Sequence, residues 1–413
     1  MDAIENLLTR GVDTIYPTRE LLEKALRSGE KLKLYQGFDP TGSQLHIGHA
    51  VALRKLREFQ NLEHEVIFLI GDFTAMIGDP TGKMDSRKML TKEEVLKNAE
   101  NYKEQAGRIL QFDGDNPVKI KYNSEWLGKV SALEFLQLSH HLTYQQVVER
   151  DMFQKRMNQG QDVYMNEFLY PVMQAYDSVA MDVDLEIGGT DQMFNMMMGR
   201  KLMRNIKQKE KYVMTVPLLT DANGVKIGKT EGNVIGLTDP PNEFYSKIMS
   251  LGDDAIIPCF TLLTDTSQEN IEDMTKNMKN GFNPMTYKKT LAFELTKQFN
   301  DQDQARDAQH EWEAIHQTGD IHWMTSSLSS LPTIQLDTIS YQGFISGASI
   351  AQGTVPMFVA SKSKFRDLQN DGAIKIIKAK TEEVIKISGD SKIKGEEGDI
   401  LRIGPKKNLK IKK

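Results

Sequence analysis

The stretch that decides the fold is Lys33-Leu-Tyr-Gln-Gly-Phe38, followed by Asp39-Pro-Thr-Gly42 and by Leu45-His-Ile-Gly-His-Ala50. The pattern predicts a strand over Lys33–Phe38, a Gly/Pro turn, and a helix over Gly48–Phe59. Downstream, Val66–Ile70 is an unbroken apolar run, which is typical of a buried parallel strand. Strand, helix and strand in this order predict a parallel sheet and an α/β fold.

The two histidines, His46 and His49, are predicted to lie where the first strand ends and the helix begins. Parallel sheets bind ligands at this edge, and a helix N-terminus offers N–H groups and a positive dipole end to phosphate. Gly48, between the histidines, lacks the Cβ that would block a flat base or ribose. A capped helix start with core histidines is the simpler interpretation of this pattern taken alone.

A second candidate is the glycine-flanked loop Asn223–Gly232, which carries Lys226 and Lys229 three residues apart. Two such lysines can swing onto a triphosphate and stabilise the charge that develops on departing pyrophosphate. An isolated loop of this composition is more often a solvated turn.

A third candidate is a helix on which Tyr170, Gln174 and Asp177 share one face, at i, i+4 and i+7. The intervening residues are mostly apolar, so the helix is predicted to be largely buried. A buried carboxylate and amide need hydrogen-bond partners. The alternative is a narrow solvated stripe.

Together these motifs resemble the tyrosine members of the class I aminoacyl-tRNA synthetases. His46-Ile-Gly-His49 is similar to their histidine signature, and Gly37-Phe-Asp-Pro-Thr-Gly42 to its flanking turn. Lys226-Ile-Gly-Lys229-Thr230 is similar to their mobile lysine loop, and Gly188-Gly-Thr-Asp-Gln192 to their ATP-binding strand and loop. The resemblance implies a Rossmann-like catalytic domain.

The resemblance also implies a role for individual residues. Catalysis is assigned to His46, His49, Lys226, Lys229, Thr41, Lys83 and Arg87; substrate binding to Tyr35, Asp79, Tyr170, Gln174, Asp177 and Gln192; and ATP binding to Gly37, Asp39, Gly48, Gly189, Asp191 and Thr230. Within this set Tyr35 and Asp177 are expected to bond the substrate phenol, and Tyr170, Gln174 and Asp79 its amino group. One departure is Glu186, where many family members carry Gln, and a carboxylate there is expected to alter the hydrogen bonds around the substrate.

The rest of the chain predicts further domains. After a Rossmann-like domain over residues 1–238, residues 239–330 have helical patterns, with Tyr287, Leu291, Leu295 and Phe299 on one helix face. Thr325–Ile339 is predicted to be a linker. Residues 341–413 resemble the small α+β S4 RNA-binding module, with Lys362, Lys364 and Arg366 placed to track RNA phosphates.

Composition is consistent with this organisation. The chain has 413 residues and a net charge of −5, yet residues 361–413 carry fifteen Lys or Arg against eight Asp or Glu. A basic module on an acidic body is a common way to bind a polyanion. The single cysteine, Cys259, excludes an internal disulfide and a cysteine-cluster zinc site, so no bound zinc is expected and a cytoplasmic location is favoured. No apolar run is long enough to cross a membrane.

The expected reaction is activation of tyrosine with ATP, accompanied by Mg²⁺, followed by transfer to the 3′ end of tRNA(Tyr) by a homodimer. Three alternatives have to be weighed. A tryptophanyl-tRNA synthetase shares the nucleotide motifs but ordinarily lacks the S4-like tail. A small-molecule adenylyltransferase needs neither the helical middle nor the tail. A non-catalytic RNA-binding protein has no physical need for the motif residues.

Overall fold

The computed structural model describes residues 2–81, 89–220, 226–227, 229–230, 233–318, 333–335, 373–378, 381, 383–386, 396–403 and 407–412. The chain forms two compact units. The first comprises Met1–Ile227, Gly236–Thr238 and Ile257–Lys276, and the second comprises Gly228–Ile235, Asp239–Ile256 and Asn277–Lys413.

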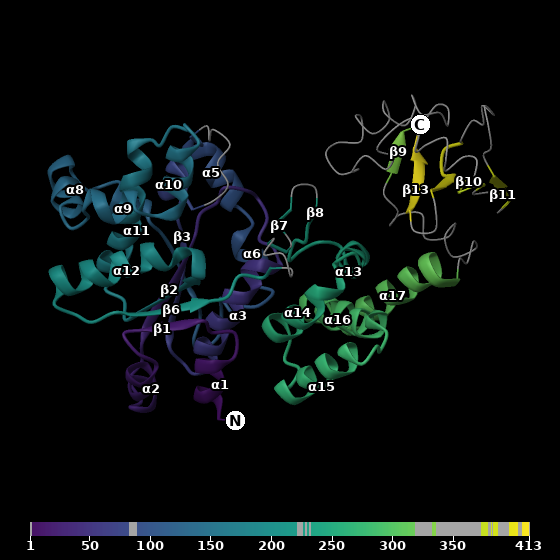
Figure 1. Cartoon of the computed structure of the whole chain (residues 1–413), viewed down its shortest axis with the longest axis horizontal. Coiled ribbons are helices and arrows are strands. Elements are labelled where there is room, and N and C mark those ends of the chain that lie inside the picture. Colours follow the sequence, from purple (N-terminus) through teal and green to yellow (C-terminus); the bar gives the residue numbers. More distant parts are fainter. Residues whose placement is uncertain are drawn as a thin grey trace. The chain divides into compact units, whose positions relative to one another are not determined.

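The first unit is built on a six-stranded sheet with the order β1-β6-β5-β2-β3-β4, of which Figure 1 labels β1, β2, β3 and β6. The strands are β1 (Thr14–Tyr16), β2 (Lys33–Phe38), β3 (Glu65–Ile70), β4 (Lys119–Tyr122), β5 (Leu185–Gly189) and β6 (Tyr212–Val216). All neighbouring pairs from β6 to β4 are parallel, which confirms the predicted α/β fold. Edge strand β1 runs antiparallel to β6, a pairing that the sequence did not reveal.

Within residues 1–207, the helices of this unit follow the strands in the order expected for an α/β protein. They are α1 (Ala3–Thr9), α2 (Arg19–Arg27), α3 (Ile47–Asn61), α4 (Thr74–Ile77), α5 (Lys92–Ala99), α6 (Tyr102–Ala106), α7 (Ser124–Leu127), α8 (Ala132–Ser139), α9 (Tyr144–Val148), α10 (Asp151–Asn158), α11 (Met165–Met181), the 3₁₀-helix η1 (Thr190–Gln192), α12 (Met193–Leu202) and the π-helix η2 (Met203–Lys207). Figure 1 shows α8, α9, α10 and α11 gathered in one group.

The two faces of the sheet bury different elements because strand side chains alternate. On one face, Tyr35 and its register partner Ile67 pack against Met181 at the end of α11. On the other face, the ring of Phe38 meets that of His49 on α3, with 5.9 Å between centroids. Burial of an apolar side chain such as Ile67 stabilises the fold by about 1.5–3 kcal/mol. The sheet therefore holds α3 and α11 on opposite sides of the end of β2.

The remaining elements are mostly helical up to residue 318. They are β7 (Lys229–Thr230), β8 (Asn233–Val234), α13 (Pro241–Met249), η3 (Asp253–Ala255), α14 (Ile256–Leu263), α15 (Gln268–Lys279), α16 (Pro284–Phe299), α17 (Gln302–Glu313) and η4 (Ala314–Thr318). The predicted helix face is confirmed in α16, where Leu291, Leu295 and Phe299 are buried. Phe299 packs edge-on against Phe244 of α13, with 5.4 Å between ring centroids.

Later residues form a second sheet with the order β11-β10-β12-β13-β9. Its strands are β9 (Thr333–Gln335), β10 (Ile374–Ile377), β11 (Val384–Lys386), β12 (Ile400–Ile403) and β13 (Lys407–Lys412). Strand β9 lies within the stretch predicted as a linker, so that prediction is wrong for these residues. Its β-branched Thr333 and Ile334 suit a strand, and β13 supplies the parallel hydrogen-bonding partner.

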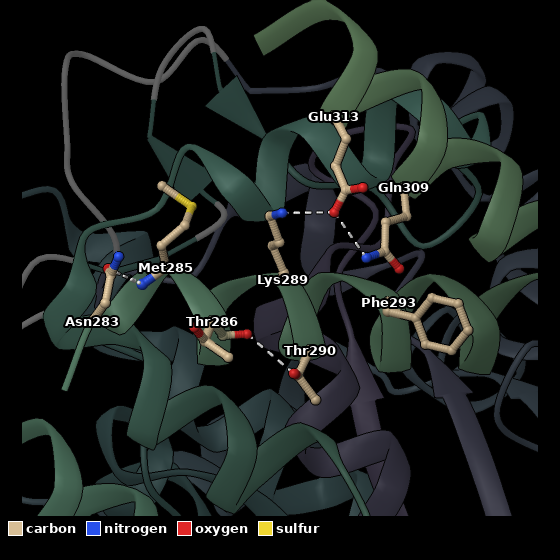
Figure 2. Close-up of a pocket in the computed structure, with 8 residues that line it drawn as sticks. All are labelled: Asn283, Met285, Thr286, Lys289, Thr290, Phe293, Gln309 and Glu313. Carbon is tan, nitrogen blue, oxygen red and sulfur yellow. Dashed lines mark hydrogen bonds and ion pairs between the residues drawn. The ribbon is translucent and has the colours of Figure 1, made fainter. Parts of the chain in front are cut away.

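A pocket of about 580 Å³ lies between α16 and α17 in the second unit (Figure 2). Figure 2 shows Lys289 and Gln309 both directed at Glu313, at 2.6 and 3.1 Å from its Oε1 atom. The pocket contains none of the predicted site residues. Within the described part of the chain, no helix has the length and apolarity that a membrane span requires.

Candidate functional site

The histidine motif forms the N-terminus of α3. His46 is the N-cap residue, and its Nδ1 accepts a hydrogen bond from the Gly48 amide at 3.1 Å. His49 Nδ1 in turn accepts from the His46 amide at 3.2 Å, which completes a reciprocal capping box. The two rings stack with 3.9 Å between centroids. The structure therefore brings both predicted histidines together at the start of a buried helix.

These caps also determine the chemistry of the two rings. A neutral imidazole that accepts at Nδ1 must carry its proton on Nε2. His46 and His49 are thus held in the tautomer that donates from Nε2, at the positive end of the α3 dipole. Such an arrangement suits a negatively charged phosphoryl group.

The structure gives a second reason for glycine at position 48. A Cβ on Gly48 would lie 2.9 Å from Cε1 and 3.0 Å from Nδ1 of the His46 ring. Real Cβ atoms essentially never come that close to another atom, so the glycine makes room for the neighbouring imidazole itself. Space for a base or ribose is not needed to explain it.

The predicted substrate helix is α11, and its first site residue reaches back to the turn after β2. Tyr170 donates from its hydroxyl to Asp39 Oδ2 at 2.6 Å, and Thr74 donates to Asp39 Oδ1 at 2.7 Å. Burial, together with the negative charge of Asp39, raises the pKa of Tyr170 well above its ordinary value. The sequence assigned Asp39 to ATP binding and Tyr170 to tyrosine binding. In the structure these two residues are hydrogen-bonded to each other.

Asp177 lies deeper on the same helix and is 2% exposed. It accepts from Trp126 Nε1 at 2.7 Å and from Asn123 Nδ2 at 3.4 Å. Burial raises the pKa of this carboxyl well above its ordinary value, and the Trp126 hydrogen bond opposes the rise. Asp177 is thus a buried acceptor held in place by two side chains that the sequence did not single out.

Gln174 and Tyr35 converge on a buried ion pair between Glu186 and Lys211. Gln174 donates from Nε2 to Glu186 Oε1 at 3.0 Å, and Lys211 donates to Glu186 Oε2. The Tyr35 hydroxyl lies 2.9 Å from Ser178 Oγ, and Lys211 donates to the same Oγ at 2.8 Å. Glu186, the one departure from the family pattern, therefore has a charged partner directly before β6.

Asp79 and Gln192 meet although 113 positions separate them. Gln192 donates from Nε2 to Asp79 Oδ2 at 2.6 Å and to Thr81 Oγ1 at 3.1 Å. Asn195, which is fully buried, donates to Gln192 Oε1 at 3.2 Å and fixes the orientation of its amide. The loop after α4 and the start of α12 are joined by these contacts.

Of the predicted lysine loop, the structure describes Lys226 with its side chain. Its Nζ pairs with Asp191 Oδ2 at 2.8 Å. This exposed ion pair joins a residue predicted to be catalytic to one predicted to bind ATP. Lys229 and Thr230 are described as the backbone of β7.

The other predicted residues divide into two groups. Gly37 lies on β2, Thr41 is exposed in the turn that follows, and Gly189 ends β5. Lys83, Arg87, Lys362, Lys364 and Arg366 lie outside the described residues. The described residues include no group of three or more His, Cys, Asp or Glu placed to hold a metal ion.

Several residues that support the candidate site are not predicted by the sequence patterns, namely Thr74, Asn123, Trp126, Ser178 and Lys211. One of them left a usable signal. Glu186 stands inside an apolar strand and Lys211 directly precedes another, and two opposite charges in such positions have to be paired. The others are recognised only by what they touch.

Comparison with known proteins gives the family. The tRNA synthetases class I (W and Y) match residues 27–317. A tyrosine–tRNA ligase of Thermotoga maritima is 39% identical over 408 residues, which cover 98% of this chain and 96% of that protein. One of Colwellia psychrerythraea is 47% identical over 308 residues, covering 74% of this chain and 76% of that protein. The chain belongs to the tyrosine–tRNA ligases.

Solved structures agree on the fold of these ligases. The tyrosyl-tRNA synthetase of Archaeoglobus fulgidus, solved with L-tyrosine, matches with a TM-score of 0.58 and 23% identity, covering 75% of this chain and all of that one. Tyrosine–tRNA ligases are aminoacyl-tRNA synthetases that join tyrosine to tRNA and use ATP as a substrate. The family and activity expected from the sequence are confirmed, in preference to the tryptophan-specific alternative.

Proposed function

We propose that this ligase binds tyrosine between β2, α11 and β5, and binds ATP at the N-terminus of α3. The proposal rests on one observation, that the four residues belong to two largely buried hydrogen-bond networks. One joins Tyr35 and Gln174 through Ser178, Lys211 and Glu186, and the other joins Tyr170 and Asp177 through Asp39, Thr74 and Asn123. Burial of a polar side chain costs free energy of desolvation, which a hydrogen-bond partner or a bound ligand has to offset.

Each end of tyrosine has its own partners in this proposal. Tyr35 and Asp177 bond the phenol, and Tyr170, Gln174 and Asp79 hold the ammonium group. Gln192, fixed beside Asp79, lies toward the substrate carboxylate. The nucleotide contacts Gly37, Asp39, Gly48, Gly189, Asp191 and Thr230, and its phosphates meet His46, His49, Thr41, Lys83, Arg87, Lys226 and Lys229.

In the first step an oxygen of the tyrosine carboxylate attacks the α-phosphorus of ATP. A P–O bond forms, the bond to the bridging oxygen breaks, and pyrophosphate leaves with the electron pair. The carboxylate is ionised at neutral pH, so no general base is required. Alignment and stabilisation of phosphoryl charge supply the catalysis, through the Nε2–H donors of His46 and His49 and the lysine loop.

In the second step the terminal ribose hydroxyl of tRNA attacks the carbonyl carbon of the adenylate, and AMP leaves. Mg²⁺ accompanies ATP and is held by its phosphates, because this ion keeps its water shell and seldom occupies an all-protein cage.

The domain limits 1–238, 239–330 and 341–413 belong to the proposal, with the helical and S4-like parts contacting tRNA(Tyr). A cytoplasmic location follows from the substrates and from the single cysteine.

The tyrosine pocket is tested by Gln174→Ala. Loss of one hydrogen bond to an ammonium group is expected to raise KM for tyrosine about 10-fold in ATP–pyrophosphate exchange, with KM for ATP unchanged. Tyr176→Phe, on the same helix, is the matched control and should change neither constant more than about twofold. Exchange with tryptophan in place of tyrosine, or an unchanged KM in Gln174→Ala, would contradict the assignment.

We further propose that the ligase is a homodimer joined through α8 to α11. Large apolar side chains between residues 133 and 165 are exposed, namely Leu133, Leu136, Tyr144, Met157, Tyr164 and Met165. Leu133 and Leu136 are each 67% exposed and lie three apart on one face of α8. Exposed apolar side chains gathered in this way mark association surfaces.

The double variant Leu133→Glu/Leu136→Glu is expected to sediment as a monomer, because two buried carboxylates at an interface cost several kcal/mol. Sedimentation velocity measures this directly. Leu21→Glu, at a site 47% exposed on α2, is the control that should remain a dimer. A wild-type chain that sediments as a monomer at micromolar concentration would exclude the dimer.

A further inference from the structure

Residues 39–45 form the turn between β2 and α3, and their backbone is held more firmly than their exposure suggests. Thr41, Gly42, Ser43 and Gln44 are exposed. The backbone groups of an exposed turn are ordinarily hydrogen-bonded to water. In this turn several of them are instead held by side chains of α5 and α6, which lie 58 to 62 positions further along the chain.

The central contact is made by the side-chain amide of Gln105 on α6, which is 4% exposed. Its Oε1 accepts from the Leu45 amide at 2.6 Å, and its Nε2 donates to the Ser43 carbonyl at 2.8 Å. A backbone N–H can only donate and a carbonyl can only accept, so only this orientation of the side-chain amide fits. Gln105 therefore satisfies one donor and one acceptor of the turn, as a neighbouring strand would.

Two further side chains hold the same turn. Tyr102 on α6 is 3% exposed and donates from its hydroxyl to the Gly42 carbonyl at 2.6 Å. Burial raises the pKa of Tyr102, as does the charge of Asp39, so the hydroxyl keeps its proton at neutral pH and remains a donor. Asn98 on α5 donates from Nδ2 to the Pro40 carbonyl at 3.0 Å. Helices α5 and α6 therefore fix the backbone of the turn through four hydrogen bonds.

The anchored turn leads directly into the proposed ATP site. Leu45 precedes His46, the N-cap of α3, and the Leu45 carbonyl accepts from the Leu237 amide at 2.9 Å. Thr41, in the exposed part of the turn, is one of the residues proposed to meet the phosphates. Donors that stabilise developing charge are effective when they are already in place before the reaction begins. Exposed side chains on an anchored backbone satisfy this condition.

We propose that Gln105 is a positioning residue for the phosphate side of the reaction, because its amide holds the turn that carries Thr41 and leads to the start of α3. The inference rests on the proposed function, in which ATP binds at the N-terminus of α3. Gln105 is buried beneath the turn, so it acts on ATP through the backbone of residues 39–45. Tyrosine, which is held by other elements, should not respond to the loss of this side chain.

The first test is Gln105→Met, which keeps side-chain length and removes both hydrogen bonds to the turn. In ATP–pyrophosphate exchange, kcat/KM for ATP is expected to fall about 30-fold. KM for tyrosine should stay within about twofold of wild type. Both constants are to be measured well below the melting temperature of the variant, so that only folded enzyme contributes.

The matched control is Gln60→Met near the opposite end of α3. Gln60 is also 4% exposed, and its amide likewise bonds to the backbone, accepting from the Gln111 amide and donating to the carbonyls of Gln111 and Asn116. The control should lower the melting temperature and leave kcat/KM for ATP unchanged. A Gln105→Met enzyme that behaves in the same way would overturn the proposal, because Gln105 would then be structural only.

Gln105→Glu provides a rescue that depends on pH. A protonated Glu has the shape of Gln and can donate to the Ser43 carbonyl, whereas an ionised Glu directs a charged oxygen at that carbonyl. Burial should raise the pKa of the introduced carboxyl above its ordinary value. The ratio of kcat/KM for ATP in the variant to that in wild type should therefore rise as the pH is lowered from about 8 to about 6. A ratio that does not change with pH would overturn the role of the Ser43 contact.

Failure of this inference can be separated from failure of the proposed ATP site. If His49→Ala leaves kcat unchanged, the assignment of the ATP site is wrong and the inference falls with it. If His49→Ala lowers kcat and Gln105→Met behaves like Gln60→Met, only the role of Gln105 is wrong.

Discussion

Replacement of His49 by alanine is expected to lower kcat for tyrosyl-adenylate formation about 100- to 1000-fold. His49 Nδ1 is occupied by the His46 amide, so the ring can offer only its Nε2–H to the reacting phosphate. Removal of one preorganised donor to developing oxyanion charge typically has an effect of this size. ATP–pyrophosphate exchange with saturating tyrosine and ATP measures the rate.

The same substitution removes a helix cap, which has to be separated from the chemical effect. Loss of the cap acceptor on α3 should lower the free energy of unfolding by only about 0.5–2 kcal/mol, which thermal melting will detect. Tyrosine binding, measured by calorimetry, should remain within about threefold of wild type. His310→Ala, at an exposed histidine of α17, is the control for rate. A kcat within tenfold of wild type would remove His49 from the catalytic set.

Asp177→Asn is expected to reduce the preference for tyrosine over phenylalanine about 50-fold. The carboxylate is buried and already accepts from Trp126 and Asn123, so an amide at this position would turn one N–H toward existing donors. The tyrosine complex loses a charge-assisted hydrogen bond, whereas the phenylalanine complex has none to lose. Exchange kinetics with the two amino acids give the ratio of their kcat/KM values.

The control for this variant is Asp182→Asn at the C-cap of the same helix, where the carboxylate is 53% exposed and pairs with Lys209. It should leave the ratio unchanged. Equal losses of kcat/KM for tyrosine and phenylalanine in Asp177→Asn would indicate a general distortion of the pocket. That result would argue against a direct role for Asp177 in recognising the phenol.

Local sequence patterns were sufficient to predict the strands and helices that carry the candidate site residues. The apolar run Val66–Ile70 and the stretch Lys33–Phe38 predicted two parallel strands, and these are β3 and β2 in register. The glycine and proline turn before His46 predicted the start of a helix. Spacing at i, i+4 and i+7 placed Tyr170, Gln174 and Asp177 on one face of α11. These features depend on neighbours in the chain, which a sequence displays directly.

Local patterns could not predict hydrogen-bond partners that lie far apart in the chain. Trp126 and Asn123 reach Asp177 across more than fifty residues, and nothing in their own surroundings distinguishes them from other polar and aromatic side chains. The antiparallel β1 and the strand β9 are further cases, since a short strand exists only when another edge pairs with it. Each of these contacts forms only when the fold brings distant parts of the chain together.

The sequence by itself therefore determined the α/β fold and the histidine turn at the sheet edge, and it predicted a place for α11 in the candidate site. Only the tertiary structure decided which partner each polar group of the candidate pocket has. It turned Asp39 toward Tyr170, paired Glu186 with Lys211, and so oriented Gln174 and Tyr35. The physical reason is that a buried polar group takes its direction from whichever partner packs against it, and packing brings those partners from distant parts of the chain.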